Sequence, residues 1–208
     1  VFSFRKVSLL DVLAEEITEG VDSRVEAFLA TVAGSVDEAT VDGVRIVNLY
    51  VVNGQDVGTE KYAYKLRWLE AVHAWIARER EAHPELVVLG DFNIAPDDRD
   101  VHDPAIWNDG HILTSAAERL ALQRLLDLGL HDAFRLHTDD GGIFSWWDYR
   151  QAGFRRDLGL RIDLTLVSDA LRERAVASGI DREPRTWERP SDHAPVWVQL
   201  TSAMDPRG

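Results

Sequence analysis

The 208-residue sequence contains no cysteine and no apolar run long enough to cross a membrane. Without cysteine, a disulfide framework and a thiolate metal site are both excluded. A membrane-spanning helix needs about 20 mostly apolar residues, and the N-terminus lacks the pattern of a signal peptide. We therefore expect a cytoplasmic protein with no membrane partner.

Basic residues are scarce relative to acidic ones. The chain has 23 Lys and Arg against 36 Asp and Glu, which gives a formal net charge of −13. This is the wrong sign for general nucleic-acid binding. An enzyme that acts on nucleic acid stays possible if the basic side chains gather on one face and the acidic ones hold a metal ion.

The overall composition is that of a globular protein, and strand and helix patterns alternate along the chain. Apolar residues make up 45% of the chain and charged residues 28%, which fits one domain. Strands are predicted at residues 44–50, 86–90, 143–149 and 161–167 and in a last segment running to Leu200, and helices at residues 60–81, 114–128 and 169–177. Residues 8–28 have a helix-like spacing that a glycine interrupts. Such alternation is typical of an α/β or mixed layered fold.

The chain is organised around the stretch Leu86-Val87-Val88-Leu89-Gly90-Asp91-Phe92-Asn93. Its apolar run predicts a short strand that is buried on both faces. Strand periodicity places Asp91 and Asn93 on one side, where both can reach one small ligand. Ligand sites in layered α/β proteins lie at the carboxyl ends of strands. The alternative is a plain turn, since Asp, Asn and Pro are all turn formers.

Two further polar clusters lie at predicted strand ends, at Asp163 and at Asp192-His193. Carboxylate and amide oxygens suit Mg²⁺ or Mn²⁺, and a histidine that a carboxylate orients can bind a phosphate oxygen or take up a proton. Such a set would suffice for phosphodiester hydrolysis. Asp192 could instead cap a turn before a strand. A carboxylate at Asp163 needs a partner, either Arg161 or a histidine from another strand.

A family resemblance rests on three motifs. They are Gly90-Asp91-Phe92-Asn93-Ile94, Gly159-Leu160-Arg161-Ile162-Asp163-Leu164 and Pro190-Ser191-Asp192-His193-Ala194-Pro195-Val196. With Phe144-Ser145-Trp146-Trp147-Asp148-Tyr149-Arg150, they resemble the exodeoxyribonuclease III branch of the endonuclease/exonuclease/phosphatase superfamily. The segments around Tyr50 and Lys61 match too, so the resemblance runs from about residue 41 to residue 200. It implies a four-layered α/β sandwich, in which two packed mixed sheets are flanked by helices.

The resemblance also implies catalytic roles. Asp91 would move the proton at the scissile phosphate, and Asn93 would orient the attacking water. His193, held in its tautomer by Asp163, would contact a phosphate oxygen, as would Tyr50. The implied ligands of the Mg²⁺ or Mn²⁺ ion are Asp91, Asn93, Asp192 and His193.

The implied partner is double-stranded DNA with abasic sites or 3′ ends. Asn53 would contact the DNA backbone, and Trp146 and Leu160 would wall a pocket for the sugar that lacks its base. Arg150 begins an arginine-rich loop, residues 150–161, that would grip the phosphates. Core packing is the alternative for Tyr50, Trp146 and Leu160, and a solvated loop is the alternative for the arginines.

The first forty residues depart from the family pattern. Relatives begin with a strand carrying a Trp-Asn pair and a second strand ending in a Gln-Glu pair, which supply metal ligands. Neither motif occurs here, and Val52 stands where the family typically has proline. Either the chain is a fragment or altered product that lacks the opening part of one sheet, or Glu15, Glu16 or Glu19 substitutes for the missing ligand.

We therefore divide the chain into an atypical segment (residues 1–43), an endonuclease/exonuclease/phosphatase domain (44–202) and a tail (203–208). The predicted function is a metal-dependent DNA phosphodiesterase of base-excision repair that incises 5′ to abasic sites and trims 3′ ends. The alternatives are a catalytically impaired DNA-binding remnant with an incomplete metal site, and a superfamily phosphatase acting on a lipid or small molecule. We expect a monomer, with dimerisation through an exposed sheet edge as the alternative.

Overall fold

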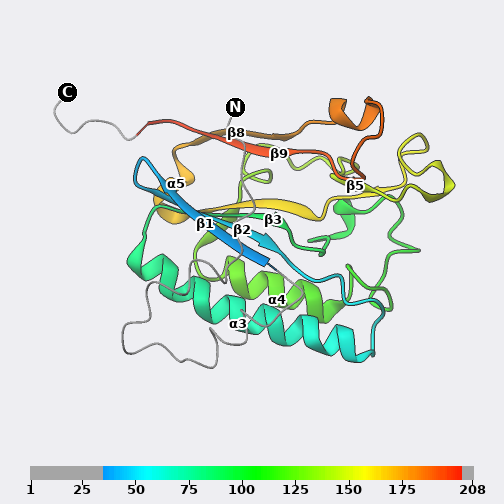
Figure 1. The fold of residues 1–208 in the computed structure, drawn as a ribbon, viewed down its shortest axis with the longest axis horizontal. Coiled ribbons are helices and arrows are strands. Elements are labelled where there is room, and N and C mark those ends of the chain that lie inside the picture. The colour runs from blue at the N-terminus through cyan, green and yellow to red at the C-terminus, as the bar shows by residue number, and fades with distance from the viewer. Residues whose placement is uncertain (1–34, 203–208) are drawn as a thin grey trace.

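The computed structural model describes residues 35–202, and its centre is a five-stranded mixed sheet (Figure 1). Across the sheet the strands are, in order, β1 (Ser35–Val41), β2 (Val44–Tyr50), β3 (Leu86–Asp91), β7 (Asp163–Ser168) and β4 (Leu130–Asp132). Strands β2 and β3 are parallel, and the other neighbouring pairs are antiparallel. A parallel pair needs a crossover connection, which helix α3 (Glu60–Ala82) provides.

Strand β3 lies in the middle of this sheet and is covered on both faces. Leu86 and Val88 belong to the core cluster beneath the helices, whereas Val87 belongs to the cluster on the opposite face. Successive strand residues point to opposite faces, so both faces need apolar side chains here. This confirms the predicted doubly buried strand and explains why its apolar residues are consecutive.

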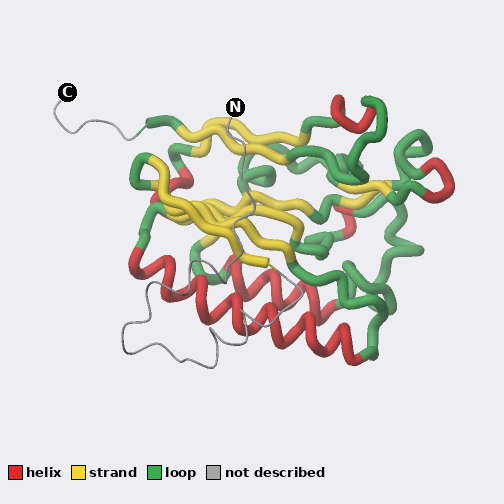
Figure 2. The backbone as a smooth tube through the Cα atoms, viewed as in Figure 1, coloured by secondary structure: helices red, strands yellow, loops and turns green. Residues whose placement is uncertain are grey.

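Helices α3 and α4 (Ala116–Leu126) cover one face of the sheet (Figures 1 and 2). The side chain of Thr59 caps α3 by accepting a hydrogen bond from the amide of Tyr62. A capping box begins α4, in which Ser115 and Glu118 each bond the other's backbone. No helix within residues 35–202 is both long and apolar enough to span a membrane.

The second sheet packs on the opposite face of the first. Its antiparallel strands β8 (Ala175–Ile180) and β9 (Val196–Leu200) contribute apolar side chains to the cluster around Val87 and Val167. Helix α5 (Asp169–Arg172) joins β7 to β8. A short ribbon of β5 (Trp146–Trp147) and β6 (Gly159–Leu160) extends beyond the carboxyl end of β3 (Figure 1).

The predicted α/β sandwich is therefore confirmed. Residues 35–202 supply a helix layer and two packed sheets (Figure 2), and the second sheet has two strands within this range. The predicted helix at residues 60–81 is α3, and the helix predicted at residues 114–128 is the shorter α4. Strand β1 lies in the segment that the sequence left unassigned.

Two predicted elements are wrong. The helix predicted at residues 169–177 ends at Arg172, and the chain continues as strand β8. Alanine, arginine and glutamate favour a helix locally, but pairing with β9 overrides that preference. The strand predicted at residues 143–149 shrinks to Trp146–Trp147. The helix-like pattern at residues 8–28 and the three glutamates proposed as substitute ligands lie outside the described residues.

Candidate active site

Asp91 and Asn93 form a compact turn at the carboxyl end of β3. One carboxylate oxygen of Asp91 accepts from the backbone amide of Asn93 at 2.8 Å, and the other accepts from its side-chain amide at 3.0 Å. The side chain of Asn93 also donates to the carbonyl of Val51 at 2.8 Å. The stretch therefore forms a turn and also brings the polar side chains of Asp91 and Asn93 together. The plain turn and the polar pair, raised as alternatives from the sequence, are compatible.

Gly90 lets the chain pass close to the neighbouring strand before this turn. A Cβ atom at Gly90, whose φ is +129°, would lie 2.0 Å from the carbonyl oxygen of Leu49. Any side chain there would push β2 away from β3. The glycine of the motif is therefore required by backbone contact.

Tyr50, at the end of the neighbouring strand, and Asn53, in the loop that follows it, lie beside this turn. Tyr50 ends β2, pairs in register with Asp91, and has 45% of its surface exposed. The exposure argues against core packing, the alternative raised for this tyrosine. The side-chain amide of Asn53 donates to the side-chain oxygen of Asn93 at 3.3 Å.

His193 and Asp163 form a second polar pair next to Asp91. Asp163 begins β7 directly opposite Asp91, and its carboxylate lies 2.9 Å from Nδ1 of His193. A carboxylate accepts hydrogen bonds only, so Nδ1 carries the proton and Nε2 is left for another partner. The predicted histidine partner of Asp163 is therefore correct and the alternative, Arg161, is wrong. That guanidinium is buried and pairs instead with the carboxylates of Asp100 and Asp132.

Ser145 fixes the position of Asp163. Its hydroxyl donates to the Asp163 carboxylate at 2.7 Å and accepts from the amides of Ile162 and Asp163. The carbonyl of Ser145 also accepts from the amide of Ala194 at 2.7 Å. One fully buried serine thus ties the ribbon, β7 and the loop that carries His193 together.

The charges of these two pairs act on each other across the strands. Burial and the negative charge of Asp163 raise the pKa of Asp91 to about 7, although His193, the Asn93 amide and Lys65 oppose the shift. Burial lowers the pKa of His193, but its hydrogen bond to Asp163 and the surrounding carboxylates outweigh this, so the net shift is upward. The site therefore holds a carboxyl group that titrates near neutral pH beside an imidazole whose protonated form is favoured by its neighbours.

Asp192 and Trp146 are joined at the rim of the site. The indole Nε1 of Trp146 donates to Asp192 at 3.0 Å, and the backbones of Trp146 and His193 form an isolated bridge. The turn here is capped by the hydroxyl of Ser191, which accepts from the His193 amide. The alternative role of Asp192 as the turn's cap is thus filled by Ser191.

Leu160 and Arg150 lie in contrasting surroundings. Leu160 is fully buried and pairs with Trp146 in the β5–β6 ribbon, and Trp146 packs against the apolar cluster that contains Leu160. The side chain of Arg150 is 88% exposed and lies 3.7 Å from Asp148. Arg150 is thus free to meet a phosphate, and the proposed DNA contacts of both residues stay predictions.

The predicted metal ligands do not form a cluster of acidic and histidine side chains. Within residues 35–202 no three His, Asp or Glu side chains form a group that could hold a metal ion. The carboxylates of Asp91 and Asp163 and Nδ1 of His193 are already engaged with neighbours. The role of Asp91, Asn93, Asp192 and His193 as metal ligands stays a prediction.

Three residues important to this arrangement were not singled out from the sequence: Ser145, Lys65 and Glu118. Lys65 gave a signal, because it interrupts the apolar face of α3 at helical spacing from Trp68, Leu69 and Val72. A charge on a buried face requires a partner. The partner, Glu118, lies on another helix and could not be identified from spacing.

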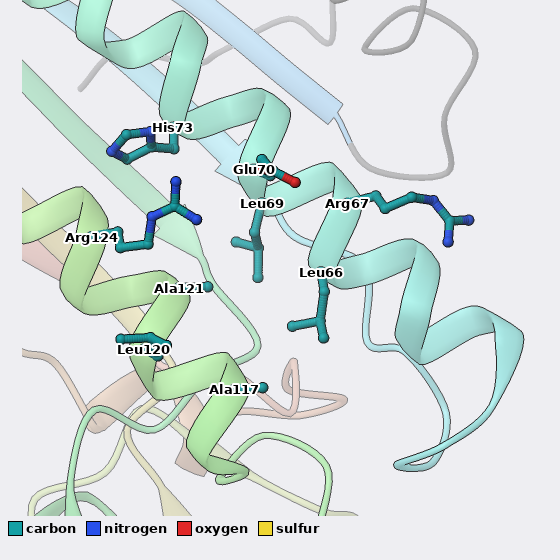
Figure 3. Close-up of a pocket in the computed structure, with 9 residues that line it drawn as sticks. All are labelled: Leu66, Arg67, Leu69, Glu70, His73, Ala117, Leu120, Ala121 and Arg124. Atoms are coloured by element: carbon teal, nitrogen blue, oxygen red, sulfur yellow. The ribbon is translucent and has the colours of Figure 1, made fainter.

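A surface pocket between α3 and α4 lies apart from these residues. It is lined by Leu66, Arg67, Leu69, Glu70, His73, Ala117, Leu120, Ala121 and Arg124 (Figure 3). None of the predicted site residues belongs to it. The polar cluster at the strand ends, not this pocket, is therefore the candidate active site.

Fold and site together define the class of protein. The model of the Endonuclease/Exonuclease/phosphatase family matches residues 20–193, and the chain belongs to this family. The expected resemblance is thereby confirmed. Within the family, exodeoxyribonucleases and abasic-site endonucleases are among its relatives.

Exodeoxyribonuclease III of Haemophilus influenzae is 37% identical over 162 residues, which are 74% of this chain and 61% of that protein. The exodeoxyribonuclease of Bacillus subtilis is 32% identical, over 78% of this chain and 62% of its own. The chain thus spans about three fifths of the length of these curated relatives.

Solved structures agree on the fold. The 3′ phosphatase NExo from Neisseria, bound to a product DNA hairpin, has a TM-score of 0.78 and 46% identity, over 80% of this chain and 64% of that one. An AP endonuclease from Archaeoglobus fulgidus has a TM-score of 0.75 and 34% identity, over 79% and 64%.

Proposed function

We propose that this chain carries the phosphoester-cleaving site of a DNA repair nuclease that acts on double-stranded DNA and depends on Mg²⁺ or Mn²⁺. The observation that carries the proposal is the pairing of Asp91 with Asp163 across β3 and β7, which sets the Asp91–Asn93 turn beside the Asp163–His193 pair. A carboxylate that accepts a proton, next to a histidine oriented by a second carboxylate, suits attack of water on a phosphate.

Each pair has a distinct task in this chemistry. Asp91, with a pKa of about 7, accepts the proton of the attacking water. Asn93 orients that water through its side-chain oxygen, because its amide N–H groups already donate to Val51 and Asp91. His193, fixed by Asp163, stabilises in its protonated form the negative charge that develops on a phosphate oxygen. Tyr50, exposed beside Asp91, is in place to donate to another phosphate oxygen.

The metal would supply charge neutralisation at the phosphate, which this acidic site needs to admit a DNA strand. Asp192 is the described residue best suited to contribute, because its Oδ1 is not used in the bond to Trp146. Mg²⁺ usually keeps several waters and takes phosphate oxygens as ligands, so few protein donors are needed.

The predicted reaction is incision 5′ to an abasic site, and a second reaction has its own support. The Neisseria relative at 46% identity is a 3′ phosphatase, and a further Neisseria structure at 47% identity is a 3′–5′ exonuclease. We therefore propose action at 3′ ends as the second candidate. It uses the same residues on a terminal phosphate.

The test is cleavage of two duplexes, one with a single abasic-site analogue and one with a 3′-phosphate, in Mg²⁺, in Mn²⁺ and in EDTA. We expect metal-dependent cleavage of at least one, with kcat lowered by a factor of about 100 to 10,000 in Asp91→Asn and in His193→Ala, because each removes a proton-transfer or charge-stabilising group. Arg124→Ala, on the outer surface of α4, is the control (Figure 3).

The other outcomes separate the alternatives. If folded protein binds DNA but cleaves neither duplex in either metal, the chain is a DNA-binding remnant. If it hydrolyses inositol phosphates in preference to both duplexes, it is a phosphatase for small molecules or lipids. Cleavage that survives both substitutions would contradict the proposed residues.

A further inference from the structure

A buried ion pair lies directly behind the candidate active site, and the chemistry proposed above does not use it. Lys65 of α3 and Glu118 of α4 form this pair, and both side chains have 0% of their surface exposed. The ammonium of Lys65 also donates to the carbonyl oxygen of Asn93 at 2.7 Å and to that of Asn53 at 3.2 Å. Its three donors are thus divided between one carboxylate and the two asparagines of the site.

Glu118 is a rigid anchor for this lysine. Besides Lys65, its carboxylate accepts from the amides of Leu113 and Ser115, each at 3.2 Å, and from the Ser115 hydroxyl at 2.6 Å. The hydroxyl of Tyr62 lies 2.7 Å from that of Ser115 and extends the network to α3. Because these bonds belong to the capping box of α4, the carboxylate cannot move without disturbing the start of the helix.

Stability alone does not account for such a pair. Removing two charges from water is unfavourable, and replacing a buried ion pair by apolar residues of similar volume is often neutral or stabilising. Burial indeed lowers the pKa of Lys65, although the charge of Glu118 and their hydrogen bond oppose the shift. The pair is better explained by the two other hydrogen bonds of Lys65, which hold the backbone carbonyls of Asn53 and Asn93.

Both backbone segments held by Lys65 contain a residue with positive φ. Asn93 has a φ of +49°, which non-glycine residues rarely adopt. The turn after Asn53 continues through Gly54, whose φ is +93°, and a Cβ there would lie 3.1 Å from the Cδ of Lys65. Conformations of this kind persist only where the surroundings determine them. The hydrogen bonds from Lys65 to the carbonyls of Asn53 and Asn93 help to hold these conformations.

We infer that Lys65, anchored by Glu118, is a positioning residue that sets the places of Asn53 and Asn93 for the reaction. The inference rests on the proposed function, because it assigns these asparagines to substrate and water. Misplacement of a catalytic group by about 1 Å lowers a rate by a factor of about 100. Loss of Lys65 should therefore lower kcat by displacing Asn53 and Asn93, although Lys65 itself does not contact the substrate.

The test compares wild type, Lys65→Met/Glu118→Gln and Val72→Ala on the duplex that wild type cleaves best. Lys65→Met alone would leave the Glu118 charge buried and risks misfolding, so the double variant removes both charges. Val72→Ala creates a cavity in the buried face of the same helix, and serves as the control for lost stability. We expect a 10- to 100-fold lower kcat in the double variant, with KM within about threefold of wild type.

A second readout does not depend on cleavage. The side-chain amide of Asn93 donates to Val51 and Asp91 and should exchange slowly with solvent. We expect its exchange to be about tenfold faster in the double variant and unchanged in Val72→Ala. Equal kcat or equal exchange in the two variants would overturn the inference. If wild type cleaves nothing, the proposed function fails, and the exchange rates still decide the role of Lys65.

Discussion

At the scale of single residues, Asp91 is held in a state that is unfavourable for a carboxylate. Its raised pKa of about 7 arises from burial and from Asp163, which lies opposite it in the sheet. The unfolded chain ionises this carboxyl near its ordinary pKa, so between that value and about 7 the folded state binds more protons than the unfolded state. The free energy of unfolding should therefore fall as the pH rises through this window.

Asp91→Asn should remove this dependence. Each tenfold change in acidity corresponds to about 1.4 kcal/mol, so we expect the variant to gain about 2 to 4 kcal/mol relative to wild type between about pH 5 and about pH 8. The measurement is urea unfolding in EDTA at several pH values. The raised pKa of His193 gives a fall of the same sign, which is smaller in the variant because the Asp91 charge contributes to that shift, so it adds to the difference. A difference that stays constant with pH would contradict the prediction.

At the scale of elements, the site depends on how strand ends and short segments are tied together. The ribbon of β5 and β6 has only two residues in each strand, and the hydroxyl of Ser145 links it to β7 by hydrogen bonds to Asp163. This hydroxyl accepts from two backbone amides. Such buried amides are costly to leave without a partner.

Ser145→Ala should therefore lower both stability and activity. We expect a loss of about 2 to 4 kcal/mol in the free energy of unfolding, from two unsatisfied amides. We also expect a kcat at least tenfold below wild type, because Asp163 loses one of its two fixed contacts. Denaturant unfolding and the duplex cleavage assay check both effects. A variant with normal kcat would show that His193 alone orients Asp163.

At the scale of the whole molecule, the net charge of −13 opposes DNA, so binding must depend on local basic groups. The exposed arginines of residues 150–156 lie on the loop between β5 and β6, at the same end of the molecule as the site (Figure 1). A phosphate contact contributes about 0.9 to the slope of log K against log salt concentration.

Arg150→Ala should thus reduce that slope by about 1 and weaken binding to duplexes of any sequence by a similar factor. The measurement is DNA binding in EDTA between about 50 and about 200 mM salt. Arg124→Ala removes the same charge from the helix layer and should leave the slope unchanged. Equal slopes for Arg150→Ala and wild type would show that Arg150 does not contact DNA.

The sequence by itself determined the elements whose signals are local. Apolar patterns located β2 and β3, helical spacing located α3, and the three motifs indicated the family. The motifs also predicted Asp91, Asn93, Asp163 and His193 as site residues. These signals suffice because periodicity and motif spacing depend only on neighbours along the chain.

Only the tertiary structure decided what depends on partners distant in sequence. Residues 175–180 became a strand because β9 pairs with them, against their local preference for helix. Asp163 took His193 as its partner, while Arg161 found two other carboxylates. Lys65 met Glu118, 53 positions away, behind the two asparagines. Burial makes each charged group take the partner that the fold brings within reach, and the order of residues alone does not specify that choice.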